Sequence, residues 1–144
     1  MTKLLLAAAL FFNTANPAWV NNLTAAKEQA KKENKLILLN FSGSDWCIPC
    51  MRMHTEVFNT EAFEKYASAN LVCINADFPR KSKNQLSKEQ LKINNALAEQ
   101  YNTNGNFPFT LLLDSDGNKL KVWDGLYKDG VASFIEEIKA AAAK

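Results

Sequence analysis

Two short, continuous apolar runs limit the folds open to this chain more than any other feature of the sequence. They cover residues 35–42 and 71–77, and both are rich in aliphatic side chains. Runs of this length without strict alternation are typical of strands that are buried on both faces of a sheet. Helical patterns separate and flank the two runs, so we expect the strands to pair in parallel through a helical crossover.

Periodic apolar residues and capping signals predict the remaining elements. Helices are expected over residues 22–33, 48–58, 61–66, 88–101 and 131–143. Asn22 and Ser87 are placed to cap two of them. Strands are expected over residues 109–113 and 120–123, joined by a turn signal at 114–118 that makes them antiparallel. The sequence therefore predicts an α/β fold with a central mixed sheet of four to five strands and helices on both faces.

The amino terminus has the pattern of a secretory signal peptide. Lys3 precedes an apolar run over residues 4–12, and a polar break ends at Ala18. The run is too short to cross a bilayer, which takes about 20 residues. A buried N-terminal helix and cleavage after Ala15 are the alternatives. We expect a signal peptide over residues 1–18, a single domain over residues 19–144, and no stable membrane insertion after cleavage.

Length, charge and cysteine count exclude several classes of protein. The 144 residues suit one domain, and 47% hydrophobic residues are too many for general disorder. A formal net charge of +2 gives no indication of nucleic-acid binding. Three cysteines are too few for a disulfide-stapled miniprotein, and at least one of them is unpaired within the chain. We expect a monomer without nucleic acid.

The motif Trp46-Cys47-Ile48-Pro49-Cys50 lies between the first predicted strand and a helix. The unpaired amides and positive dipole of a helix N-terminus stabilise a thiolate, and such placement lowers a cysteine pKa from about 8.5 to roughly 3.5–7.5. Pro49 suits a first helical turn, where its missing N–H has no cost. This placement favours redox chemistry at the cysteine pair, without a bound metal or cofactor.

Metal binding and a structural disulfide are the alternatives for this motif. If the two cysteines of the motif bound zinc, Cys73 and His54 would have to supply the other two ligands, at a spacing that is unusual for zinc sites. Haem attachment would need a histidine directly after the second cysteine, where Met51 stands. His54 follows Cys50 by four residues, so the cysteine pair and His54 are also candidates for a copper(I) site. An exported copper-handling protein is therefore the alternative function.

The chain resembles thioredoxin over about residues 20–143. The resemblance rests on the first strand, the Trp-Cys-x-x-Cys motif and the helix after it. It also rests on the later Phe107-Pro108, which precedes a strand and hairpin. Residues 34–35, 41–46 and 56–58 resemble, more narrowly, the exported thioredoxin-like proteins of bacteria. That group includes the C-terminal domain of the membrane disulfide-interchange reductase. The resemblance implies the thioredoxin fold and thiol–disulfide exchange with protein substrates.

The resemblance also implies roles for the two cysteines and the later proline. Cys47 corresponds to the exposed attacking thiolate, and Cys50 corresponds to the resolving thiol. Pro108 corresponds to the family's cis-proline, with an ordinary trans turn proline as the alternative. The backbone of Phe107 corresponds to the segment that pairs with extended substrate.

Three residues of the motif complete the substrate-facing set. Trp46 packs beside the cysteines in the family, and Ile48 and Pro49 stand between them. We expect a reductase or isomerase rather than an oxidant, with a membrane protein as its redox partner. The C-terminal residues carry no endoplasmic-reticulum retention signal, and we expect a periplasmic or secreted protein.

Some positions depart from thioredoxin. Asn40 stands where thioredoxin has a buried aspartate that relays protons, and an amide cannot accept a proton. The relay would then use water or another group such as Glu56. Met51 replaces a basic residue, although Arg52 follows it. Redox potential depends on such neighbours, so the direction of exchange stays open at this point.

Two further features have an ordinary and a functional interpretation. Cys73 lies in a predicted buried strand, where a free cysteine is commonly a small core residue. Pairing with another chain is the alternative. A basic stretch carries Arg80, Lys81 and Lys83, and we expect a solvated loop there, with a partner-docking patch as the alternative.

Overall fold

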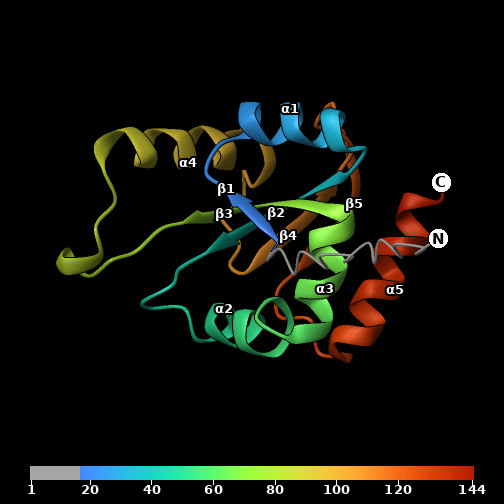
Figure 1. Cartoon of the computed structure of the whole chain (residues 1–144). Helices are drawn as coiled ribbons and strands as arrows, with labels where there is room; N and C mark the ends of the chain where they lie inside the picture. The colour runs from blue at the N-terminus through green and yellow to red at the C-terminus, as the bar shows by residue number, and fades with distance from the viewer. Residues whose placement is uncertain (1–16) are drawn as a thin grey trace, which may run out of the picture.

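The computed structural model describes residues 17–144, and most of the predicted signal peptide lies outside this range. A five-stranded sheet forms the centre, in the order β1-β3-β2-β4-β5 (Figure 1). Its strands are β1 (Ala18–Val20), β2 (Leu36–Ser42), β3 (Leu71–Asp77), β4 (Phe109–Leu113) and β5 (Lys119–Asp124). β3 pairs in parallel with β1 and β2, and β4 is antiparallel to both β2 and β5. The predicted mixed sheet is confirmed.

Helices cover both faces of this sheet, as the sequence predicts (Figure 1). One face carries α1 (Leu23–Glu33) and α4 (Lys88–Tyr101). The other carries α2 (Ile48–Met53), α3 (Glu61–Asn70) and α5 (Gly130–Ala142). Among residues 17–144, no helix combines the length and the apolar character needed to cross a membrane.

The continuous apolar run of β2 is explained by burial on both sides. Leu38 packs into the core beneath α3 and α5, whereas Ile37 and Leu39 pack into the core beneath α1 and α4. All three side chains are fully buried. A strand between two helical layers has no solvent face, so it has no need of polar alternation.

The structure differs from the predicted elements in four places, the first being a short 3₁₀ helix, η2 (Ser82–Asn84), in the basic loop. β1 was not predicted, because it has only three residues and its first, Ala18, is the last residue of the predicted leader. The helix after the cysteines is interrupted, since α2 continues into a π-helical turn, η1 (His54–Phe58). α3 continues four residues past the predicted end to Asn70. The predicted caps are confirmed, as Asn22 and Ser87 accept hydrogen bonds from Ala25 and Gln90.

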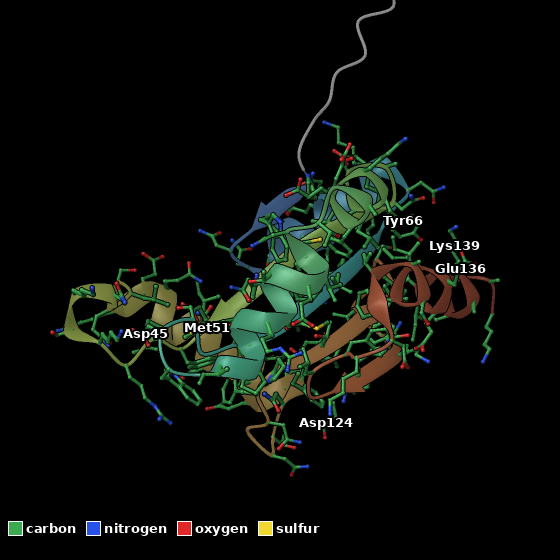
Figure 2. The ribbon with its side chains drawn as sticks, turned by 90° about the horizontal axis from the view of Figure 1, so that it is seen from below. Asp45, Met51, Tyr66, Asp124, Glu136 and Lys139 are labelled. Atoms are coloured by element: carbon green, nitrogen blue, oxygen red, sulfur yellow. A yellow bond between two sulfur atoms is a disulfide. The ribbon has the colours of Figure 1, made fainter. Side chains whose placement is uncertain are left out.

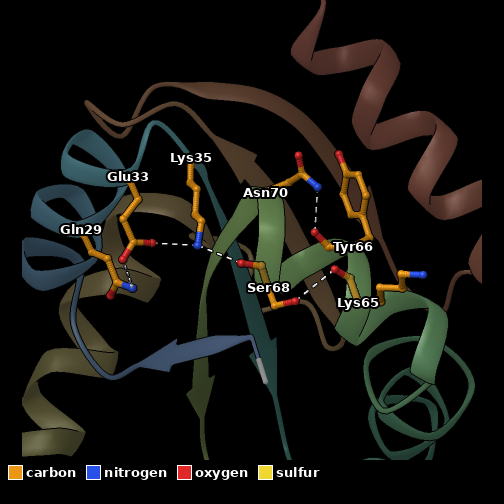
Figure 3. Close-up of polar contacts among 7 residues, drawn as sticks. All are labelled: Gln29, Glu33, Lys35, Lys65, Tyr66, Ser68 and Asn70. Carbon is orange, nitrogen blue, oxygen red and sulfur yellow. Dashed lines mark hydrogen bonds and ion pairs between the residues drawn. The ribbon is translucent and has the colours of Figure 1, made fainter. Parts of the chain in front are cut away.

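The two ends of the molecule carry different chemistry. Figure 2 places Asp45 and Met51, which flank the cysteine motif, at the opposite end from Tyr66 and Lys139. At that far end, the Lys35 ammonium reaches the Glu33 carboxylate at 2.7 Å and the Ser68 carbonyl at 2.9 Å (Figure 3). These contacts tie the end of α1 to the last turns of α3. The cysteines lie at the other end of the molecule, after the carboxyl end of β2 and away from these contacts.

Candidate active site

Cys47 and Cys50 lie directly after the carboxyl end of β2, at the start of α2. The two residues form a disulfide, with their α-carbons 5.2 Å apart. Cys47 is the N-cap of α2, and its Sγ accepts a hydrogen bond from the Cys50 amide at 3.3 Å. Pro49 occupies the first turn. The local sequence thus places the pair where the unpaired amides of a helix can act on sulfur.

Both sulfurs are enclosed by the protein in this oxidised state. Cys50 is fully buried, and its Sγ accepts from the Gly43 amide at 3.5 Å. We expected an exposed Cys47, but the residue is only 5% exposed. In this oxidised state its Sγ is bonded to Cys50 Sγ and also accepts the hydrogen bond from the Cys50 amide. Ile48, at 69% exposed, is the prominent apolar side chain of the motif.

Trp46 connects the cysteine loop to two other loops. Its indole Nε1 donates to the Phe78 carbonyl at 2.7 Å, after the end of β3. Its ring meets the Phe107 ring edge-on, with the centroids 5.5 Å apart. Phe107 in turn packs against Phe78 at 5.6 Å. Segments more than 60 residues apart along the chain therefore meet beside the disulfide.

The Phe107–Pro108 loop lies before β4, and its peptide bond is cis. Pro108 is buried, and its carbonyl accepts from the Gly125 amide at 2.9 Å. Phe107 is half-buried against Trp46. The structure thus brings these two predicted site residues to the same end of the sheet as the cysteine motif.

A polar group of side chains lies under the helix that carries the cysteines. The Asn40 amide nitrogen donates to Asn75 at 2.9 Å, and the Asn40 oxygen accepts from the Thr110 hydroxyl at 3.0 Å. The same nitrogen lies 3.5 Å from His54 Nε2. Asn40 and Thr110 are fully buried. Where thioredoxin has an aspartate, this chain therefore has Asn40, a neutral amide whose nitrogen and oxygen are both hydrogen-bonded.

Glu56, the suggested relay group, does not lie at this position. Its carboxylate pairs with Arg52 at 2.8 Å on the exposed side of the helix. The titratable group beside Asn40 is instead His54. Burial lowers the pKa of His54 below its ordinary value, and this outweighs the opposite effects of the Asp77 charge and the Asn75 hydrogen bond. The sequence shows the single histidine, but not that its ring turns toward β2.

The proposed copper(I) ligands do not form a site. Within residues 17–144, no group of three or more His, Cys, Asp or Glu side chains is arranged to hold a metal ion. The two thiols are joined in a disulfide, and His54 Nε2 faces Asn40. The copper alternative therefore has no structural support.

The basic loop after β3 is exposed, as the sequence predicts, but it is also held to the cysteine loop. The Asp45 carboxylate accepts hydrogen bonds from the Arg80 and Lys81 amides at 2.9 Å and from the Asn84 side chain at 3.0 Å. These bonds hold the pKa of Asp45 below its usual range, and the bond from the Arg80 amide has the largest effect. The Arg80 guanidinium lies 3.6 Å from the centre of a Trp46 ring. Sequence reasoning missed both contacts, because they join residues about 35 positions apart.

Cys73 is a core thiol, in agreement with the sequence. It lies in β3, is fully buried and is free. Burial raises its pKa to about 12. A thiol with this pKa is protonated at neutral pH and takes no part in exchange, because the thiolate is the reactive form.

Comparison with known proteins supports the geometry. A family model described as thioredoxin-like matches residues 18–115. The chain belongs to the thioredoxin-like family. It is 33% identical to the disulfide bond reductase DsbH of Chlamydia pneumoniae over 127 residues, which cover 88% of this chain and 74% of the relative.

Solved structures of thioredoxin-like proteins agree with this assignment. A DsbH oxidoreductase is 30% identical, with a TM-score of 0.81, over 99% of this chain and 95% of that one. The C-terminal domain of Neisseria meningitidis DsbD in its reduced form is 27% identical, with a TM-score of 0.54, over 83% and 93% of the two chains. The resemblance inferred from the sequence is confirmed. With its thioredoxin-like fold and oxidised cysteine pair, the protein is a thiol–disulfide oxidoreductase.

Proposed function

We propose that this protein is a periplasmic disulfide reductase or isomerase that acts on protein substrates through its Cys-Ile-Pro-Cys motif. The observation that carries the proposal is the Cys47–Cys50 disulfide at the start of α2, with the exposed Ile48 between its cysteines. The similarity to a relative named as a disulfide bond reductase supports the reducing direction.

The reducing cycle follows from the arrangement of the two sulfurs. The Cys47 thiolate of the reduced enzyme attacks a substrate disulfide, and a mixed disulfide forms as one substrate sulfur leaves and takes a proton. Cys50 then loses its proton and attacks Cys47. The second substrate sulfur leaves as a thiol, and the Cys47–Cys50 bond forms. Two electrons pass to the substrate, and no bound cofactor is needed.

Backbone amides favour the charged sulfurs in this cycle. The Cys50 amide donates to Cys47 Sγ, and the Gly43 amide donates to Cys50 Sγ. Hydrogen bonds donated to a thiolate stabilise its charged form. A membrane redox partner would return the pair to the dithiol state after each turnover.

The residues around the disulfide form the substrate surface of this proposal. Trp46, Ile48 and Pro49 border the pair on the motif side, and Phe107 and Pro108 border it from the loop before β4. The Phe107 backbone would pair with an extended substrate segment. The proposal also includes export by a signal peptide over residues 1–18 and a monomeric mature domain over residues 19–144.

Reduction of insulin with dithiothreitol tests the activity. The mature chain should accelerate it, Cys47→Ser should abolish the acceleration, and Cys50→Ser should accumulate mixed disulfides. Cys73→Ala is the matched control and should keep the activity, because the Cys73 thiol is buried and protonated. A reduction potential near about −270 mV would support a reductase, whereas one near about −120 mV would contradict it in favour of an oxidant.

A further inference from the structure

Arg80 is held in a fixed place beside the redox motif. Its guanidinium carbon lies 3.6 Å from the centre of a Trp46 ring, and Trp46 directly precedes Cys47. A cation over an indole face is attracted by the negative potential of the ring. The indole is itself fixed, because Nε1 donates to the Phe78 carbonyl at 2.7 Å.

The backbone of Arg80 is fixed as well. The Asp45 carboxylate accepts from the Arg80 and Lys81 amides, both at 2.9 Å, and from the Asn84 side chain. Asp45 stands one residue before Trp46 in the cysteine loop. The same short segment therefore holds Arg80 at both ends, by its amide and by its guanidinium. This arrangement orders a side chain that is otherwise costly to immobilise.

The hydrogen-bonding edge of this guanidinium has no partner within the part of the chain that the structure describes. The ion pairs there use other cations, which are Lys31, Lys35, Arg52, Lys121 and Lys139. The carboxylate nearest in sequence to the stack, Asp45, is occupied by backbone amides. Arg80 is exposed, so its donors face solvent. A planar guanidinium with free donors matches a carboxylate in a bidentate pair.

The loop that carries Arg80 has an excess of positive charge, although the Asp45 carboxylate contacts its backbone and Asp77 and Glu89 flank it. Residues 78–88 include Arg80, Lys81, Lys83 and Lys88 and contain no acidic residue. All four are exposed. A surface of this kind attracts acidic partners and repels basic ones, and the attraction weakens as salt rises.

We propose that Arg80, with the loop it belongs to, binds an acidic side chain that flanks the disulfide of a protein substrate. This inference rests on the proposed function and names its substrate class. Because Arg80 stacks on the residue before Cys47, a carboxylate bound there holds the neighbouring substrate disulfide close to the attacking sulfur. The loop therefore selects acidic substrates.

Two synthetic peptides test this selection with the reduced mature chain. Each contains one disulfide, and they differ only in whether Glu or Lys residues flank the cysteines. We expect the wild type to reduce the Glu peptide about twofold to fivefold faster at low salt, the upper part of the range for an exposed charge pair. The ratio should fall as salt is added.

Variants distinguish the effect of the Arg80 side chain on this preference from the effect of the protein's overall charge. R80Q should bring the two rates together, and R80K should keep only part of the preference, because an ammonium cannot form the bidentate pair. K65Q removes the same charge from α3 and should leave the preference unchanged. Equal rates for the two peptides in the wild type, or a preference that persists in R80Q, would overturn the inference. If the wild type reduces neither peptide nor insulin, the proposed function fails, and this inference fails with it.

Discussion

The Trp46 indole lies so close to Gly43 that a β-carbon there would be 2.3 Å from Cε2 of the ring. Real β-carbons do not approach other heavy atoms this closely. The sequence shows Gly43 only as the residue that ends a strand, whereas the structure shows it as the surface against which the tryptophan packs. Trp46 can take this position, and make its contacts with other groups, only because residue 43 is a glycine and has no β-carbon.

Gly43→Ala should displace the indole and weaken the contacts of Trp46 with Phe78, Phe107 and Arg80. We expect a loss of about 1–3 kcal/mol in the free energy of unfolding, the usual cost of overpacking, and slower disulfide exchange. Urea denaturation measures the first effect, and the insulin assay measures the second.

The double variant Gly43→Ala/Trp46→Ala is the control for this interpretation. If the clash is the cause, the glycine substitution should cost little once the indole is absent, and the two effects should not add. Additive losses would show that Gly43 matters for its backbone instead.

Thr110→Val should destabilise the protein through the buried amide of Asn40. The Thr110 hydroxyl donates to the Asn40 oxygen at 3.0 Å, and both residues are fully buried. Valine has a similar shape but leaves that oxygen without its donor, at a cost of about 1–3 kcal/mol. Thr55→Val is the matched control, because the Thr55 hydroxyl is exposed and bonds only the Met51 carbonyl. We expect a change within about 0.5 kcal/mol there, and equal losses in the two variants would contradict the prediction.

The polar group around Asn40 shows what the sequence can and cannot predict. Local patterns predict the strands that carry Asn40, Asn75 and Thr110, since each strand is a compact run of residues. Their meeting depends on register, which aligns Asn40 with Asn75 in β3 and with Thr110 in β4. A shift of one residue would turn Asn40 to the opposite face of the sheet. Asn75 and Thr110 are 35 and 70 residues away from Asn40 in the sequence, and no local sequence pattern shows how such distant strands align.

The redox motif was more predictable than its surroundings. Cys47 and Cys50 are three residues apart, so their pairing and their place at the start of α2 follow from local chain geometry. The contacts of Asp45 with Arg80 and Lys81 instead depend on where the loop after β3 returns. The basic residues alone predict an exposed loop, and nothing in them shows that a carboxylate one residue before the motif holds it in place.

The Cys73 thiol should be unreactive in the folded protein. Burial raises its pKa to about 12, so almost none of it is thiolate at pH 8. The oxidised native chain should therefore show no thiol that reacts with an aromatic disulfide reagent, and one should appear in denaturant. Cys73→Ser should cost about 1–3 kcal/mol, since it buries a hydroxyl in an apolar core, whereas Cys73→Ala should cost less. Rapid labelling of the oxidised native chain would contradict this prediction.

Stability should fall as the pH drops below about 6.5, and His54 should be the cause. Burial, the largest effect, lowers the pKa of His54 in the folded state, so the unfolded chain binds this proton more readily. The stabilisation is complete above the unfolded pKa of about 6.5 and is lost as the pH falls toward the lower native pKa. His54 is the only histidine, and oxidised Cys47 and Cys50 do not titrate, so His54 is the side chain whose ordinary pKa lies between pH 7.5 and 5.5. Urea unfolding of the oxidised wild type should show this decline. His54→Gln keeps a polar side chain but cannot titrate, and its free energy of unfolding should change much less over the same window. A decline of equal size in His54→Gln would assign the effect to other groups.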